Sequence, residues 1–161
     1  MPRLQHFGLI PLTIIAALML AIIPLPDWGR YARPDWVGLV IIFWSIVLPQ
    51  VFSIGSAWIT GLLLDVILGA PLGQNALGFV IVVYITSRMH QQFLTAPLLQ
   101  QAFFVAILLL IKQFLSLWIN GMTGHLADNL YLYFAPSLVA MLLWPWLFIV
   151  MRDLGRGRRL I

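Results

Sequence analysis

Long apolar stretches with almost no charge constrain this chain more than any other feature. Residues 98–119, for example, contain one charged side chain, that of Lys112. Of all 161 residues, 62% are hydrophobic and 9% are charged, whereas a soluble domain carries about 25% charged residues. A helix that spans a bilayer needs about 20 mostly apolar residues. The sequence therefore predicts an all-α polytopic membrane protein that uses lipid as its solvent.

Six apolar stretches are predicted to be transmembrane helices. They cover approximately residues 7–25, 36–52, 54–70, 76–92, 98–119 and 131–151, and a basic cytoplasmic tail follows at 152–161. Together they use most of the chain, so we predict a single six-span membrane domain over residues 1–161 without a separate soluble domain. The third and fourth stretches are short, and merging them would give five spans with the termini on opposite sides of the membrane.

The distribution of basic residues favours six spans with both termini in the cytoplasm. In that arrangement the outer side holds only Arg30 and Arg33, in a loop that also carries Asp27 and Asp35. The cytoplasmic side holds Arg3, Arg88, Arg152, Arg156, Arg158 and Arg159. Cytoplasmic loops are enriched in Lys and Arg, and Trp and Tyr gather at the interfaces, as they do here near the predicted outer ends. We therefore expect a multi-pass membrane protein with both termini in the cytoplasm.

Two charged residues lie within predicted spans, where burial of a charge costs about 2.5–3.5 kcal/mol on insertion scales. Asp65 lies on a helix stripe at i+4 spacing that comprises Ser53, Ala57, Gly61, Asp65 and Gly69. The other members of the stripe are small, which allows another helix to approach closely. Lys112 shares a polar helix face with Gln113, Ser116 and Asn120. Because both charges are predicted at about the same depth, a buried Asp65–Lys112 ion pair is one hypothesis. Structural packing, snorkelling of Lys112, a partner-binding face and a transport site are the alternatives.

Other polar residues have simpler explanations. Asp35 directly precedes the apolar stretch at Trp36 and can cap that helix, while Arg33 could reach a partner or Asp65. The cluster of Arg156, Arg158 and Arg159 is either a topology signal or a site for anionic lipid headgroups. Cysteine is absent, and the three histidines lack metal-ligand spacing. No group of side chains suits a nucleophile or acid–base pair, so neither an enzyme nor a cofactor is predicted.

Two sequence segments resemble the bacterial rod shape-determining MreD family. They are Arg-Pro-Asp-Trp at 33–36 and the segment 61–77, GLLLDVILGAPLGQNAL. The resemblance implies an inner-membrane protein of the cell-elongation machinery. Its implied partners are an MreC-like single-span protein, the MreB filament indirectly, and a RodA-type polymerase with its class B penicillin-binding transpeptidase. It also implies six helices arranged like the membrane substrate-binding subunits of energy-coupling-factor transporters.

A chain confined to the bilayer can act through its lateral faces and short loops. Together with the resemblance, this predicts a non-enzymatic scaffold and regulator that supports lateral peptidoglycan synthesis and cell shape. A small-molecule-binding subunit of a membrane transporter is the alternative. The candidate structural or partner-interface residues are Arg33, Asp35, Trp36, Gly61, Asp65, Gly69, Pro71, Gly73, Lys112 and Asn120.

Overall fold

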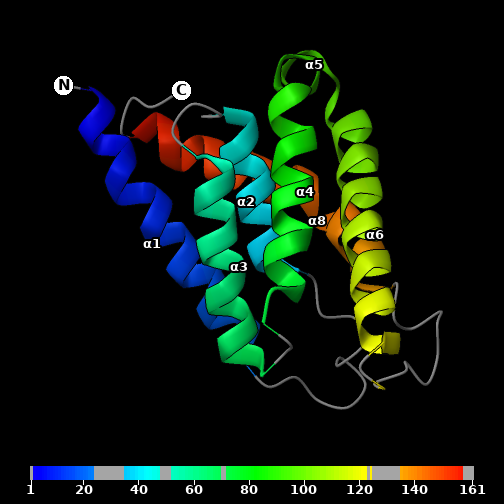
Figure 1. Ribbon diagram of the computed structural model, residues 1–161. Coiled ribbons are helices and arrows are strands. Elements are labelled where there is room, and N and C mark those ends of the chain that lie inside the picture. The colour runs from blue at the N-terminus through cyan, green and yellow to red at the C-terminus, as the bar shows by residue number, and fades with distance from the viewer. Residues whose placement is uncertain are drawn as a thin grey trace.

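The computed structural model describes residues 2–23, 35–47, 52–69, 72–122, 124 and 135–157, with the side chains of 2–7, 9 and 154–157 excepted. Within these residues the chain forms seven helices (Figure 1). They are α1 (Pro2–Ile22), α2 (Trp36–Val47), α3 (Ile54–Leu68), α4 (Gln74–Arg88), α5 (His90–Thr95), α6 (Leu98–Met122) and α8 (Ala135–Gly157). The predicted α-helical class is confirmed for the described part of the chain.

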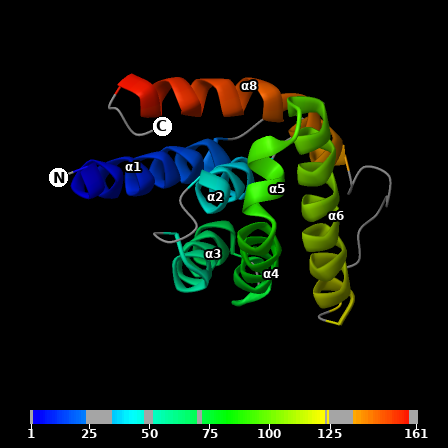
Figure 2. The ribbon, with the colours of Figure 1, turned by 90° about the horizontal axis from the view of Figure 1, so that it is seen from above.

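Helix α2 forms the centre of the bundle. Every residue from Val37 to Ile46 is buried, because α1, α4, α5, α6 and α8 all pack against this helix. A helix that is hydrophobic all round is stable when it is covered on all sides. Around it, α3 pairs with α4, α4 with α6, and α6 with α8. Seen from above, α4 lies between α3 and α6 (Figure 2).

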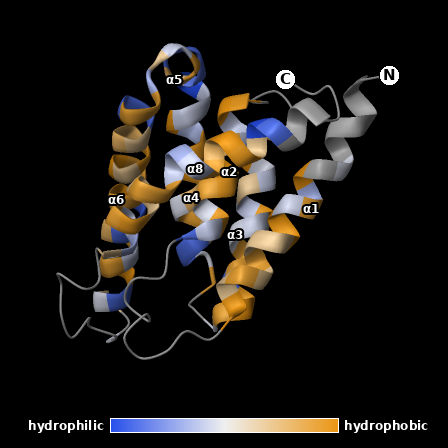
Figure 3. Ribbon diagram, turned by 180° about the vertical axis from the view of Figure 1, so that it is seen from behind, coloured by the Kyte–Doolittle hydropathy of each residue, from blue (hydrophilic) through white to orange (hydrophobic). Residues whose placement is uncertain are grey.

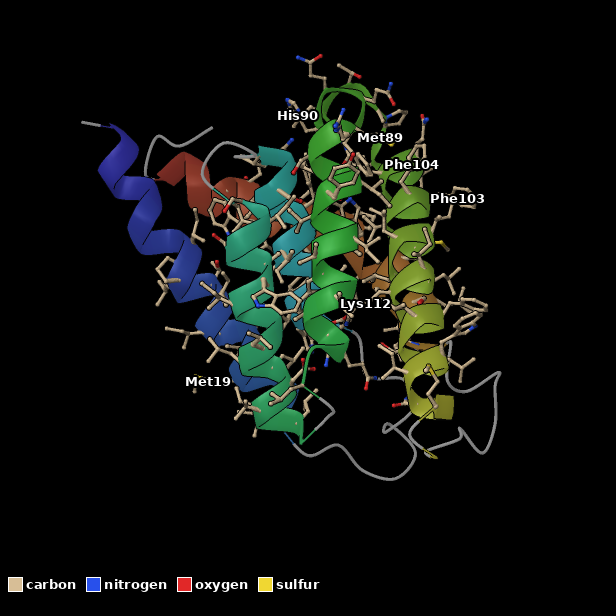
Figure 4. The ribbon with its side chains drawn as sticks, viewed as in Figure 1. Met19, Met89, His90, Phe103, Phe104 and Lys112 are labelled. Carbon is tan, nitrogen blue, oxygen red and sulfur yellow. The ribbon has the colours of Figure 1, made fainter. Side chains whose placement is uncertain are left out.

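The outer surface of the bundle is strongly apolar: much of α6 is orange in the hydropathy colouring (Figure 3), and Ile59, Leu63 and Val66 of α3 are exposed. On α6, Phe103, Phe114 and Trp118 are 59%, 56% and 65% exposed. Phe103 projects away from the other helices (Figure 4). Buried polar or charged residues lie inside instead: Ser45, Thr60, Asp65, Gln74, Asn75, Thr86, Gln101, Lys112, Ser116 and Ser137. Water would not tolerate an apolar surface of this extent, whereas lipid favours it.

Two helices in the described residues are long and apolar enough to cross a bilayer by length and composition. They comprise Leu98–Met122 and Ala135–Asp153. Shorter apolar helices cover Ile10–Ile22, Trp36–Val47 and Ile54–Leu68.

The fourth helix differs from the sequence prediction. It ends at Arg88 instead of continuing through Gln92, and α5 begins after a turn at Met89. Met89 adopts φ −110° and ψ 14°, outside the helical geometry, and the His90 ring Nδ1 lies 2.8 Å from the Ser87 carbonyl oxygen. This side-chain contact at the turn accompanies the change in direction between α4 and α5.

Candidate functional site

Asp35 is the N-terminal cap of α2. Its Oδ1 accepts a hydrogen bond of 3.0 Å from the Gly38 backbone N–H. The first N–H groups of a helix have no partner within the helix, and a carboxylate placed before it satisfies one of them and stabilises the positive end of the helix dipole. The predicted capping role of Asp35 is confirmed. Trp36 follows directly as the first residue of α2 and is half-buried against the core.

The second Asp35 oxygen binds Lys112. The Lys112 Nζ donates to Asp35 Oδ2 at 2.5 Å, and the two side chains are 7% and 17% exposed. The ammonium also lies 4.4 Å from the centre of the Phe79 ring, so it contacts α4 as well. Lys112 thereby joins three helices, α2, α4 and α6, and its position between α4 and α6 is visible in Figure 4. An opposite charge and an aromatic face together offset the cost of desolvating the ammonium.

Two glycines make room for this ion pair. A Cβ at Gly78 of α4 would lie 2.5 Å from the Lys112 Cγ. A Cβ at Gly38 of α2 would lie 2.8 Å from Asp35 Oδ2 and 3.0 Å from a methyl carbon of Leu109. Small residues are the usual means by which helices approach closely in lipid. Here they also let the lysine stem pass between α4 and α6 to its carboxylate.

Asp65 does not bind Lys112, so the hypothesis of an Asp65–Lys112 pair is wrong. Its carboxylate accepts three hydrogen bonds from the start of α4: 2.9 Å from the Gly73 N–H, 3.0 Å from the Asn75 N–H and 2.7 Å from the Asn75 Nδ2. The N-cap position of α4 is Gly73, which has no side chain to perform this role. Asp65 supplies the cap from the neighbouring helix and is fully buried. Asp65 of α3 and Lys112 of α6 do not meet because α4 lies between these two helices (Figure 2).

The other predicted glycines shape the same end of the α3–α4 hairpin. A Cβ at Gly61 would fall less than 3.0 Å from the backbone of Ala76, so α3 and α4 touch through their main chains. Gly69 ends α3 at φ 69° and Gly73 precedes α4 at φ 96°. Both lie in the left-handed region, which glycine adopts without steric cost. These three glycines allow the tight turn that brings Asp65 to the start of α4.

The remaining predicted residues lie elsewhere on the helices or outside the described part of the chain. Asn120 is partly exposed near the end of α6. Arg33, Pro71, Arg158 and Arg159, and the side chain of Arg156, lie outside the described part of the chain.

Sequence reasoning missed a second polar contact between helices, centred on Gln101 of α6. Its Nε2 donates to the carbonyl oxygens of Phe93 at 2.6 Å and Ala96 at 3.1 Å, while the Trp144 Nε1 donates to its Oε1 at 3.4 Å. Gln101 thus holds the α5–α6 turn and α8 together. The signal was present, because Gln101 lies 11 residues before Lys112, about three helical turns along the same face.

The comparison with known families identifies the family of this chain. The family model for rod shape-determining protein MreD matches residues 1–154. The chain belongs to the MreD family. It is similar to the rod shape-determining protein MreD of Haemophilus influenzae (strain ATCC 51907 / DSM 11121 / KW20 / Rd), with 29% identity over 157 residues that cover 98% of this chain and 96% of the relative. No solved structure matches the chain.

Membership in the MreD family confirms the polytopic membrane class and assigns a role in rod-shape determination. The family acts in cell shape without enzymatic activity. The ionic groups described above are consistent with such a role, because Asp35, Lys112 and Asp65 all bind groups of the chain itself.

Proposed function

We propose that this MreD-family chain is a six-span scaffold of the bacterial cell-elongation machinery. It holds partner membrane proteins in a geometry that supports lateral peptidoglycan synthesis. The observation that supports the proposal is the placement of polar and apolar side chains in the bundle. The polar groups join α2, α3, α4 and α6 to one another, whereas the outward face of α6 is apolar. A rigid bundle with apolar lateral faces can select partner helices and shift their conformational populations.

The arrangement in the membrane is part of this proposal. We infer both termini in the cytoplasm of a bacterium, with the α1 start and the α8 end at the same side of the bundle as α5. Three observations support it: the blue start of α1 and the red end of α8 lie toward the same end of the molecule (Figure 1), α5 connects α4 and α6 at that end, and basic residues Arg88 and Arg152 fall there. The similarity in architecture to energy-coupling-factor membrane subunits belongs to the same proposal.

The partners follow from the family and from the lack of catalytic chemistry in the described residues. The partners proposed are an MreC-like single-span protein and a RodA-type polymerase with its class B penicillin-binding transpeptidase, and the MreB filament is reached indirectly. Anionic lipids would contact the basic residues at the cytoplasmic end. The alternative, a ligand-binding transporter subunit, needs free polar groups facing a cavity. Asp35, Lys112 and Asp65 instead bind one another or the backbone, so the scaffold is favoured.

The experiment is depletion and complementation in a rod-shaped host, combined with affinity purification. Cells that lack the native protein should round up, and this chain should restore rods and recover an MreC-like protein. D35N and K112M should lower both the rescue of shape and the recovery of the partner. The conservative variant L63V, in the middle of the lipid-facing side of α3, is the matched control. Normal rods after depletion, accompanied by lost uptake of a nutrient, would overturn the scaffold in favour of the transporter subunit.

A further inference from the structure

The helices that face outward have very different lengths. On α3, exposed apolar side chains run from Ile54 to Leu68, which corresponds to about 21 Å at 1.5 Å per residue. On α6 they run from Leu99 to Met122, about 35 Å. The hydrocarbon core of a typical bilayer is about 30 Å thick. Within the described residues the apolar face of α3 is therefore shorter than such a bilayer is thick, whereas that of α6 exceeds it.

The apolar band on α4 is short, and its Arg88 end carries an exposed charge. At its start, Asn75 binds the Asp65 carboxylate. At its end, the Arg88 guanidinium carbon lies 5.2 Å above the Tyr84 ring, and His90 follows in the next turn. The distance along the helix from Asn75 to Arg88 is about 20 Å. The Arg88 end cannot be drawn deeper into hydrocarbon without burying a charge.

The long helices are inclined relative to the short ones. Viewed from above, α3 and α4 are strongly foreshortened, whereas α6 and α8 extend across the picture (Figure 2). A helix that is longer than the local hydrocarbon thickness reduces its span by tilting. Their inclination thus reduces the thickness that α6 and α8 span, toward the thickness that α3 and α4 can span.

We propose that this chain binds a locally thinned bilayer, with a hydrocarbon core of about 20–25 Å against the α3–α4 face. The occupant of this face is lipid with short or compressed acyl chains. Mismatch costs free energy for each ångström, and such costs sort membrane proteins among regions of different thickness. The inference rests on the proposed membrane-spanning arrangement but is independent of the scaffold role.

The test uses the purified full chain in vesicles of phosphatidylcholines that differ only in acyl length, from about 14 to about 22 carbons. The readout is the midpoint of thermal unfolding, followed by far-UV circular dichroism. We expect the highest unfolding midpoint in the lipids with the shortest acyl chains. The midpoint should fall steadily as the acyl chains lengthen. An unfolding midpoint that is highest at about 18 carbons, or that does not depend on acyl-chain length, would overturn the proposal. A dimer joined through α3 that removes the dependence on acyl-chain length would also overturn it.

Matched variants separate hydrophobic length from general stability. Ser53 is exposed just before α3, and Arg88 ends α4 at the same side of the hairpin. The double variant S53L/R88L extends the apolar band there and should move the optimum toward longer chains. L63V changes the middle of the band and should leave the optimum in place. An unmoved optimum in S53L/R88L refutes the proposal, even where that variant still restores rod shape and so leaves the scaffold intact.

Discussion

Replacing one partner of the Lys112–Asp35 pair should be far more harmful than replacing both. In D35N the asparagine still caps α2, but the Lys112 ammonium, only 7% exposed, keeps just the Phe79 ring as a partner. Breaking a buried pair typically costs about 3–5 kcal/mol, and a cation–π contact offsets about 0.5–2 kcal/mol at most sites. We expect D35N to lower the free energy of unfolding by about 2–4 kcal/mol.

K112M should be milder, because Asp35 keeps its bond to the Gly38 N–H and its place at the positive end of α2. The Asp35 side chain also retains 17% exposure. We expect a loss of about 1–3 kcal/mol, the usual cost of an unsatisfied buried group. The double variant D35N/K112M carries no charge and keeps the cap, so its loss should be about 1 kcal/mol or less, well below the sum of the single losses.

The assay is unfolding of the purified variants in detergent micelles, followed by far-UV circular dichroism. All three variants and the parent chain are compared under one condition, which yields the coupling energy of the pair. A coupling energy above about 1.5 kcal/mol supports the assignment. Losses that simply add, or a double variant that is less stable than either single one, would refute the reasoning that Lys112 and Asp35 stabilise each other.

Three further perturbations have definite expected outcomes. G61A places a methyl group against the Ala76 backbone and should cost about 1–3 kcal/mol in the same unfolding assay; an unchanged midpoint would show that α3 and α4 can separate freely. D65N replaces one accepting oxygen by an amide donor at the start of α4 and should cost about 1–3 kcal/mol, whereas equal stability would contradict the capping role. Q101L removes the contacts to α5 and to Trp144 and should speed limited proteolysis of the α5–α6 turn; parent-like cleavage would argue against a clamp there.

Much of the local structure was predictable from short-range chemistry. Asp35 before Trp36 predicted an N-cap, because a carboxylate at that position can satisfy helix N–H groups whatever the rest of the fold does. Gly69 and Gly73 adopt positive φ at the two sides of the α3–α4 turn, a local conformation that glycine adopts without steric cost. The resemblance carried by residues 33–36 and 61–77 predicted the family, which the match over residues 1–154 confirms.

The two intramembrane charges show what the sequence by itself determined. It placed Asp65 and Lys112 inside predicted helices, and burial confirms that both are enclosed by the bundle. Their positions along the helices follow from chain length at a fixed rise per residue. The requirement that each must find a partner also follows from the sequence, because an unpaired charge in lipid is costly.

Only the tertiary structure decided which partner each charge takes. Depth does not specify the order of helices around a bundle, and here α4 lies between α3 and α6 (Figure 2). Lys112 therefore reaches past Gly78 to Asp35, while Asp65 turns to the unsatisfied N–H groups of α4. The physical reason is that pairing depends on lateral neighbours, and these are set by packing among all the helices at once.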